Sequence, residues 1–392
     1  MFGYVFVVVL MTGWYYFCQR FGDKHVKYFL VGTAVIMTLF YGLRGQGVGS
    51  DTYPYFVMFQ RDGAQSFSNL WDYMWEMKSP AYVLSEWLFY RILPYPQLWL
   101  IATSAFFFFP FSKFVEKNSM DPYFSYFIFF TIFGTFQMTG IRQSCAMAVL
   151  MMAFEQMKKK KLIKYLLLVG LAYLFHKSAI VFLPFYFVGK RKITKLDLPI
   201  ILIAVVAIYG NRGFLFDYIK SFTSYDYFEQ LNHGEPINFS IMIYGATLLA
   251  LWLCMTLTSR AKRKEMKPYQ NENGLQNANN AFQSSARKPV SYALAHQKAR
   301  KDVELVLYSQ YANAMLLASL FMPLVAVNGA VRRIVMYFAL FMVLLIPKAF
   351  REFIEPNSRK ILNLLFGAAL LYLLLSGVYG SSYSYSLFFV EG

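Results

Sequence analysis

The chain is built mainly of apolar runs, each followed by a short polar or basic stretch. Most of these runs approach the length of about 20 residues that a helix needs to cross the hydrocarbon core of a bilayer. Their spacing predicts an all-α, polytopic integral membrane protein with about twelve transmembrane helices. The predicted spans are residues 2–18, 28–43, 96–114, 121–137, 139–157, 162–176, 177–189, 196–210, 238–258, 303–325, 330–350 and 361–380.

The segments between the spans differ in length and composition. A further apolar stretch at 80–93 carries Glu86 and Arg91 and is bounded by prolines, so we predict a re-entrant or interfacial helix within an external loop at 44–95. Glu86 is expected either to bind sugar or to solvate the surface of this helix. A second external loop is predicted at 211–238.

One long segment, 259–302, is polar and poor in apolar residues, which is typical of a flexible connector. It is predicted to be a flexible cytoplasmic loop. No soluble domain and no internal repeat stands out, so residues 1–392 are predicted to form a single membrane domain.

Composition and charge support this interpretation. Charged residues make up 15% of the chain, against about 25% in a soluble domain. The net charge of +17 comes from basic clusters between the apolar runs, such as KKKK at 158–161 and GKRK at 189–192. With both termini outside and 80–93 not counted as a span, the positive excess falls on the inner side, as the positive-inside rule requires. The charge therefore indicates a multi-pass membrane protein whose basic loops face the cytoplasm, and no nucleic-acid partner.

The cysteines give no sign of a metal or a disulfide framework. Cys18, Cys145 and Cys254 all lie in apolar runs and form no CxxC pair. The histidines in loops lack the spacing of metal ligands. We therefore expect neither a metal nor a cofactor.

Ionisable residues at the edge of the membrane are costly and are functional candidates for that reason. In the predicted orientation several of them lie at the outer face. These are Arg44, Asp51, Arg142, His176, Lys177, Arg332 and Arg333. Arginine presents a planar fork of donors to phosphate oxygens, so the four arginines predict a binding site for phosphate or diphosphate.

Local sequence strengthens this prediction at two of the arginines. Arg142 and Arg332 lie near predicted helix N-termini, where free backbone N–H groups favour an anion. The glycines of RGQGVG (44–49) would let backbone approach a ligand closely. The alternative for Arg44 is a topology-setting or snorkelling side chain, and for one of Arg332 and Arg333 a side chain that faces lipid headgroups.

The predicted external loop at 211–238 interleaves aromatic residues with carboxylates. Tyr225, Asp226 and Tyr227 are the predicted sugar-binding residues, because aromatic rings pack on sugar faces and carboxylates accept from hydroxyls. The alternative is an aromatic belt at the membrane interface.

Four short motifs, in this order, carry a family resemblance: RGQGVGSDTYPY (44–55), GIRQSCAMAV (140–149), FHKSAIVFLP (175–184) and RRIVMYF (332–338). With them the chain resembles the EpsG family of Wzy-type polysaccharide polymerases. One departure is SDTYPY, where the family more often has a TDYxxY-like run.

The resemblance implies a GT-C-like membrane glycosyltransferase that joins oligosaccharide repeat units carried on undecaprenyl diphosphate at the periplasmic or outer face. Donor and acceptor are then both lipid-linked glycans, and the surroundings are membrane lipid. Chain-length control in such systems usually requires a separate regulator protein, which no motif here names. Arg44, Arg142, Arg332 and Arg333 would stabilise the leaving diphosphate.

The reaction also needs a base for the acceptor hydroxyl. His176 is the first candidate because the ordinary pKa of histidine lies near the working range, and Asp51 is the second, or else a partner of Arg44. Three alternatives to a polymerase remain: a transporter or flippase of lipid-linked saccharides, a glycan ligase, and a binding or assembly subunit.

Overall fold

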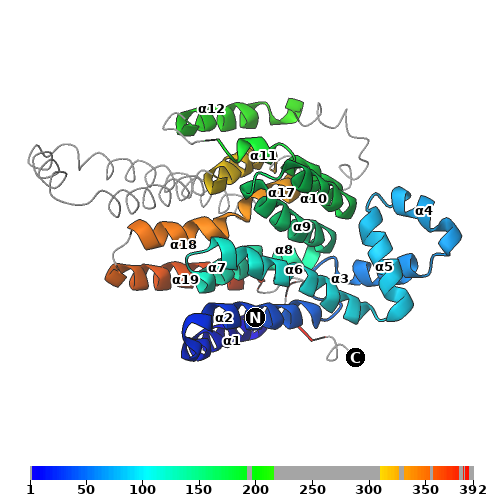
Figure 1. The fold of residues 1–392 in the computed structure, drawn as a ribbon, viewed down its shortest axis with the longest axis horizontal. Helices are drawn as coiled ribbons and strands as arrows, with labels where there is room; N and C mark the ends of the chain where they lie inside the picture. Colours follow the sequence, from blue (N-terminus) through cyan, green and yellow to red (C-terminus); the bar gives the residue numbers. More distant parts are fainter. Residues whose placement is uncertain are drawn as a thin grey trace, which may run out of the picture. The chain divides into compact units, whose positions relative to one another are not determined.

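The computed structural model describes residues 2–191, 197–215, 310–325, 331–353, 356–378, 383 and 385–387 of the chain. Within these residues every regular element is a helix, which confirms the predicted all-α class for this part of the chain (Figure 1). The predicted span at 238–258, the loop at 259–302 and the residues Tyr225, Asp226 and Tyr227 lie outside the described residues.

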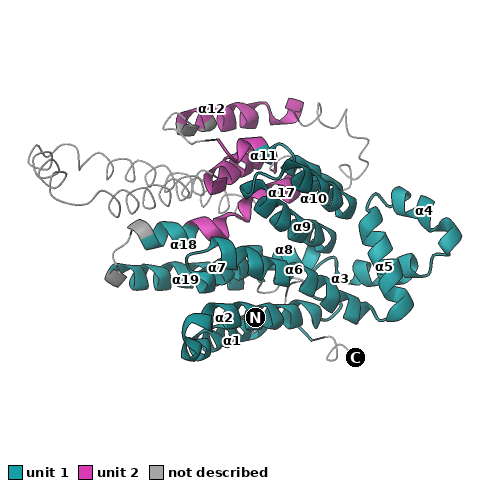
Figure 2. Cartoon of the chain, viewed as in Figure 1, with its two compact units in different colours: residues 1–186, 346–392 teal, residues 187–345 magenta. Residues whose placement is uncertain are grey.

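The chain divides into two compact units (Figure 2). Unit 1 combines Met1–Tyr186 with Ile346–Gly392, and unit 2 is Phe187–Leu345. Unit 1 is therefore discontinuous in sequence.

The first half of unit 1 is a helical hairpin packed on a long helix. Helix α2 packs against both α1 and α6. The hydroxyl of Ser112 on α6 donates to the carbonyl of Leu30 on α2 at 2.9 Å. The elements are α1 (Phe2–Cys18), η1 (Gln19–Lys24), α2 (His25–Gly42) and α6 (Pro96–Asn118).

The predicted span at 121–137 is a continuous helical stretch with a π-helical segment at its centre. The carboxylate of Asp121 accepts from the backbone N–H of Phe124 at 3.0 Å and so caps the start of the stretch. Its three parts are α7 (Pro122–Ile128), η2 (Phe129–Phe133) and α8 (Gly134–Thr139).

The next two predicted spans form an antiparallel hairpin. Helix α9 (Ile141–Lys158) packs along α10 (Leu162–Phe175), and the basic run at 158–161 forms the turn between them. A 3₁₀ segment, η3 (Lys177–Phe182), and the short α11 (Phe185–Val188) follow. The last helix of unit 1, α19 (Pro356–Val378), packs against α7 and η2.

The segment at 44–95, expected to be a loop with one interfacial helix, contains three helices. They are α3 (Thr52–Gly63), α4 (Phe67–Glu76) and α5 (Pro80–Ile92). Helix α5 is the one that the sequence predicted, and Pro80 starts it with the fixed backbone angle that suits a first helical residue. It packs against α3, α4 and α10.

In unit 2 the described elements are α12 (Asp197–Gly210), a helix over Gln310–Val325, α17 (Arg332–Ala339) and the first residues of α18 (Met342–Phe353). The side-chain amide of Asn313 donates to the carbonyl of Arg191 at 2.7 Å and ties this helix to the preceding turn.

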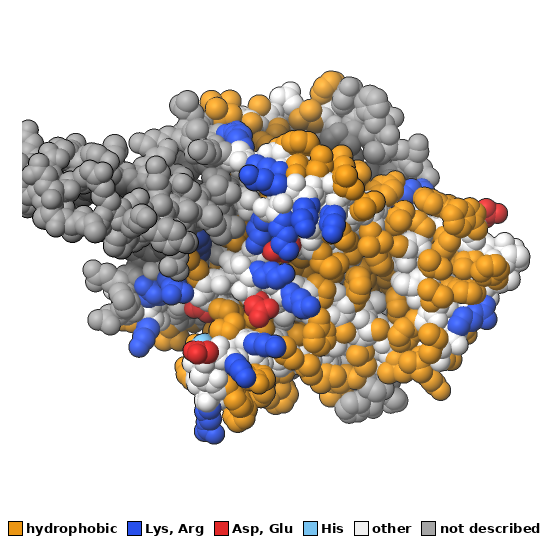
Figure 3. All heavy atoms as spheres, viewed as in Figure 1, with side chains coloured by type: hydrophobic (Ala, Val, Ile, Leu, Met, Phe, Trp, Pro, Cys, Tyr) orange, Lys and Arg blue, Asp and Glu red, His pale blue; other side chains and the backbone are white. Residues whose placement is uncertain are grey.

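Four helical segments among the described residues are long and apolar enough to cross a membrane: Phe2–Gly42, Pro96–Asn118, Arg332–Arg351 and Ser358–Val378. In the most apolar stretch of the first and of the last segment only 22% of the residues are buried, as lipid-facing stretches would be. Figure 3 shows hydrophobic side chains over much of the visible face, with Lys and Arg side chains gathered on one part of it. The protein is therefore a membrane protein, and the count of about twelve spans stays a prediction.

Candidate functional site

Several helix ends meet at one end of unit 1. Tyr55 on α3 donates from its hydroxyl to the carbonyl of Thr139, the last residue of α8, at 3.2 Å. The side-chain amide of Gln97, in the first turn of α6, donates to the carbonyl of Arg44 at 3.2 Å. Because α9 and α10 are antiparallel, His176 leaves α10 at the end where Arg142 begins α9. The lysines at 158–161 lie at the opposite end of this hairpin, as the predicted orientation requires.

Arg44 lies inside unit 1 with a side chain that is only 1% exposed. Its guanidinium donates to the hydroxyl of Thr52 at 3.0 Å, to the carbonyl of Met138 at 2.9 Å and to the carbonyl of Tyr41. Burial lowers the pKa of Arg44 to about 10, which leaves the side chain charged at neutral pH. In this arrangement Arg44 joins the ends of α2 and α8 to the start of α3. Binding of diphosphate by Arg44 stays a prediction.

The glycine-rich loop after Arg44 is held by the C-terminal part of unit 1. Arg44 forms an isolated antiparallel bridge with Leu387, and the N–H of Gly45 donates to the carbonyl of Ser386 at 2.9 Å. Gly49 has a φ of +84°, which a side chain would disfavour, and an added Cβ would also meet Met138 at 3.2 Å. The glycine at this position therefore serves a tight turn.

Asp51 is half-buried and directly precedes α3. Its carboxylate accepts from the hydroxyl of Ser50 at 2.9 Å. Among the described residues Asp51 forms no ion pair with Arg44, whose Nε faces Thr52 instead. The predicted role of Asp51 as a partner of Arg44 is thus not the arrangement seen, and its role as a base stays a prediction.

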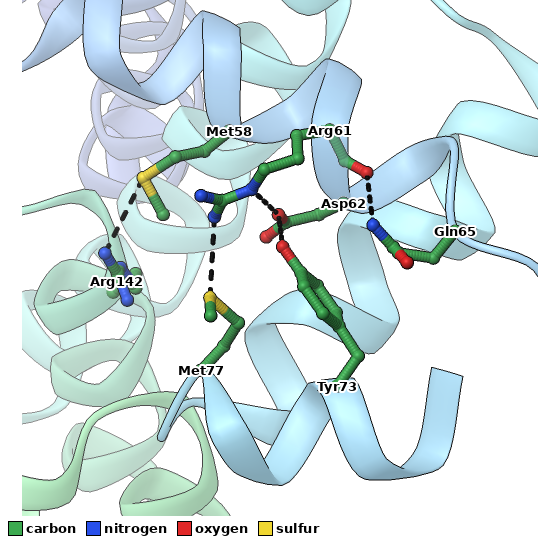
Figure 4. Close-up of polar contacts among 7 residues, drawn as sticks. All are labelled: Met58, Arg61, Asp62, Gln65, Tyr73, Met77 and Arg142. Atoms are coloured by element: carbon green, nitrogen blue, oxygen red, sulfur yellow. Dashed lines mark hydrogen bonds and ion pairs between the residues drawn. The ribbon is translucent and has the colours of Figure 1, made fainter. Parts of the chain in front are cut away.

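Arg142 is the second residue of α9 and is half-buried, so its predicted place at a helix N-terminus is confirmed. The guanidinium donates to the hydroxyl of Ser79 at 3.0 Å and contacts the sulfur of Met58 at 3.7 Å. Figure 4 shows the Met58 contact. In the described part of the chain no carboxylate pairs directly with Arg142. Its neutral partners are ones that a phosphate could displace.

His176 is half-buried in extended backbone between α10 and η3. Its neighbour Phe175 packs against an apolar cluster that includes Tyr82 and Ile141. The structure thus brings His176 to the region where α9 begins, and catalysis by His176 stays a prediction.

Arg332 and Arg333 are half-buried and open α17 in unit 2, so the predicted helix start is confirmed. They belong to a different unit from Arg44 and Arg142. The convergence of the four arginines on one ligand stays a prediction.

A pair of buried carboxyl groups, Asp62 on α3 and Glu86 on α5, accompanies these residues and was not predicted as a pair. Both side chains are fully buried. The alternative that Glu86 solvates a helix surface is therefore wrong. A lone acid in an apolar run pointed to Glu86, whereas Asp62 in the polar stretch QRDGAQ gave no signal.

Among the described residues no group of three or more His, Cys, Asp or Glu is placed to hold a metal ion. A model of the EpsG family matches residues 27–389. The chain belongs to the EpsG family. This is the family of Wzy-type polysaccharide polymerases, and the resemblance carried by the four motifs is thereby confirmed. No curated protein and no solved structure matches the chain.

Proposed function

We propose that this EpsG-family protein polymerises oligosaccharide repeat units linked to undecaprenyl diphosphate at the outer face of the bacterial cytoplasmic membrane. The observation that carries the proposal is the family match over residues 27–389, which includes every predicted site residue. The opposite placement of Arg142 and the lysines at 158–161 along α9 supports the outer-face orientation, because basic loops favour the cytoplasmic side.

The reaction breaks the bond between an anomeric carbon and a lipid diphosphate through a transition state with oxocarbenium character. Negative charge grows on the leaving diphosphate and must be stabilised. Arg142 is the leading candidate for this role, since it is half-buried, lies at a helix N-terminus and, among the described residues, makes its side-chain contacts with the neutral groups of Ser79 and Met58. Arg44, Arg332 and Arg333 are proposed as further ligands of the diphosphate.

The acceptor hydroxyl loses a proton as its oxygen attacks. His176 is the proposed base, with Asp51 as the second candidate, and both come from the end of unit 1 where Arg142 begins α9. Tyr225, Asp226 and Tyr227 are proposed to contact sugar. The protein would work in a GT-C-like fold without a metal, alone or with a chain-length regulator.

The test is a reconstitution in liposomes with lipid-diphosphate repeat units and no nucleotide sugar. A ladder of longer glycans supports a polymerase. Transfer of a single unit onto another lipid core would show a ligase instead, and translocation without bond formation would show a flippase.

Arg142→Lys tests the leaving-group role in the same assay. We expect a loss of at least tenfold in polymerisation rate, because lysine cannot reproduce a planar fork of donors. Arg20→Lys is the matched control, since Arg20 is exposed on η1 and also lies over an aromatic ring, that of Phe17 at 5.7 Å. Full activity of the Arg142 variant at unchanged protein level would remove Arg142 from the mechanism.

A further inference from the structure

We propose that Asp62 and Glu86 form a binding site for hydroxyl groups of the acceptor saccharide. This inference rests on the proposed polymerase function and adds to it a sugar-recognising pair in unit 1.

Among the described residues, only one of the two carboxylate oxygens of Asp62 accepts hydrogen bonds. Its Oδ1 accepts from the Nε of Arg61 at 3.0 Å and from the hydroxyl of Tyr73 at 2.6 Å. Figure 4 shows both groups directed at the Asp62 carboxylate. The other oxygen, Oδ2, is buried and has no hydrogen-bond partner among the described residues.

The side chain of Glu86 is fully buried. Within the part of the chain that the structure describes, neither Oε1 nor Oε2 of Glu86 has a hydrogen-bond partner. A buried polar group without a partner destabilises the folded protein, and a charged one does so more strongly. Such groups persist where they have a use, because an apolar residue of the same size would avoid the cost.

A shared proton accounts for part of this arrangement. Burial and the neighbouring carboxylate of Asp62 raise the pKa of Glu86 well above its usual range, so Glu86 holds a proton at neutral pH. A protonated carboxyl donates one hydrogen bond, and a single O–H directed at Asp62 would give Oδ2 a partner. The hydroxyl of Tyr82 is near enough to lower the pKa of Glu86 in part, but it does not meet hydrogen-bond geometry with either Oε atom, so the carbonyl oxygen of Glu86 would still lack a donor among the described residues.

A hydroxyl group of a sugar could supply the missing donor. The hydroxyl of Tyr73 already donates to Asp62, so the pair accepts an O–H in the structure as it stands. The remaining acceptors are carboxyl oxygens, and hydroxyl groups can donate both to the charged Asp62 and to the carbonyl oxygen of neutral Glu86. A site built to accept from hydroxyls discriminates strongly against ligands that lack them.

The pair also lies beside the proposed leaving-group site. Tyr82 and Glu86 are spaced i and i+4 and therefore share one face of α5, and Ser79 is the residue directly before that helix. Ser79 accepts from Arg142, and the ring of Tyr82 lies under its guanidinium, with the Cζ of Arg142 5.8 Å from the ring centre. The charge of Arg142 also acts on Glu86, partly offsetting the rise in its pKa. Helix α5 and the residue before it thus connect Arg142, the proposed diphosphate ligand, with Glu86 of the proposed hydroxyl-binding pair.

The experiment compares two ligands on purified protein in lipid nanodiscs. One is the lipid-linked repeat unit isolated from cells that lack this protein, and the other is undecaprenyl diphosphate without sugar. The ratio of their affinities measures what the saccharide contributes. In Asp62→Asn and Glu86→Leu we expect this ratio to fall about tenfold or more, the size of one charge-assisted hydrogen bond, with binding of the bare lipid unchanged.

Two controls separate a binding role from a structural one. Asp72→Asn changes an exposed carboxylate on α4 and should leave the ratio unchanged. Glu86→Gln replaces the protonated acid by an amide of the same shape, which keeps a donor toward Asp62 and a carbonyl acceptor, so it should retain the ratio that Glu86→Leu loses. An unchanged ratio in folded Asp62→Asn, or equal ratios for folded Glu86→Leu and wild type, would overturn the inference while leaving the polymerase proposal intact. Wild-type protein that binds neither lipid would overturn the polymerase proposal itself.

Discussion

The Cζ of Arg142 lies 5.8 Å from the centre of the Tyr82 ring, a distance at which the face of an aromatic ring attracts a cation. Tyr82 is fully buried and its hydroxyl accepts from the indole N–H of Trp99 at 3.4 Å. The ring therefore holds the guanidinium at the start of α9 in a defined place.

Tyr82→Leu should weaken binding of undecaprenyl diphosphate several-fold, because the cation–π attraction of about 0.5–2 kcal/mol is lost. Tyr82→Phe keeps the ring and should bind within about twofold of wild type on the same basis. Affinity for the bare lipid in nanodiscs measures both. Equal affinities for the two variants would show that the ring does not position Arg142.

Arg44→Lys should lower the thermal unfolding midpoint in detergent. A lysine offers one nitrogen where Arg44 uses three, so the carbonyl of Met138 or the hydroxyl of Thr52 loses its donor inside the protein. Each lost buried hydrogen bond costs on the order of 1–3 kcal/mol. Arg20→Lys on the exposed η1 is the control. An unchanged midpoint together with a lost glycan ladder would favour the predicted diphosphate role over the structural one.

Gly42→Ala tests the contact between α2 and α6. A Cβ at Gly42 would lie 2.7 Å from the Cα of Ile101, and backbone cannot move aside as a flexible side chain can. The two helices would have to separate next to Arg44, so we expect a lower unfolding midpoint. Gly13→Ala on α1 is the matched control, because nothing lies within 4 Å of its added Cβ. There a helical alanine should stabilise slightly. Similar midpoints for the two variants would contradict the close approach.

Glu86 should make stability depend on pH in a definite direction. Its pKa in the folded protein is raised, chiefly by burial and then by Asp62, above the ordinary value of 4.5. The folded state therefore binds the proton more tightly than the unfolded state, and stability falls as pH rises above about 4.5 toward the raised pKa. Tyr82, Arg142 and Cys145 also face this carboxyl and act on its charge.

Glu86→Gln removes this titration. The variant should be at least as stable as wild type at neutral pH, and its unfolding midpoint should fall less between pH 5 and pH 8. Midpoints in detergent across this range provide the measurement. Identical pH profiles for the two proteins would show that Glu86 does not hold a proton in the folded state.

The helices of unit 1 were predictable because their apolar runs approach the length that a helix needs to cross the hydrocarbon core of a membrane. The predicted stretch 139–157 is α9 and the predicted 162–176 is α10, each within a residue or two. The sequence also placed Arg142 at the start of this helix, with the lysines at 158–161 at its other end. What an apolar pattern cannot give is the partner of a polar side chain. Asp62 and Glu86 come from separate helices, and only the packing of α3 on α5 reveals their proximity.

The segment at 44–95 was interpreted as a loop because its helices are short and mixed in polarity. Helices α3 and α4 are too short and too polar to signal a span, and their stability comes from packing against neighbours. Arg44 shows the same limit. An arginine after a membrane span suggested a ligand, whereas its actual contacts are backbone carbonyls and a hydroxyl that only folding brings near.

The hydrogen bond from Gly45 to Ser386 sets the order in which parts of unit 1 can assemble. Because the ribosome delivers residues in sequence, Phe187–Leu345 must be synthesised before the loop at 44–51 can acquire its backbone partner. Until then the helices that are synthesised first lie in the membrane while the loop at 44–51 lacks this backbone partner. Maturation of this end of unit 1 is thereby a late event, timed by translation of the final helix and the few residues beyond it.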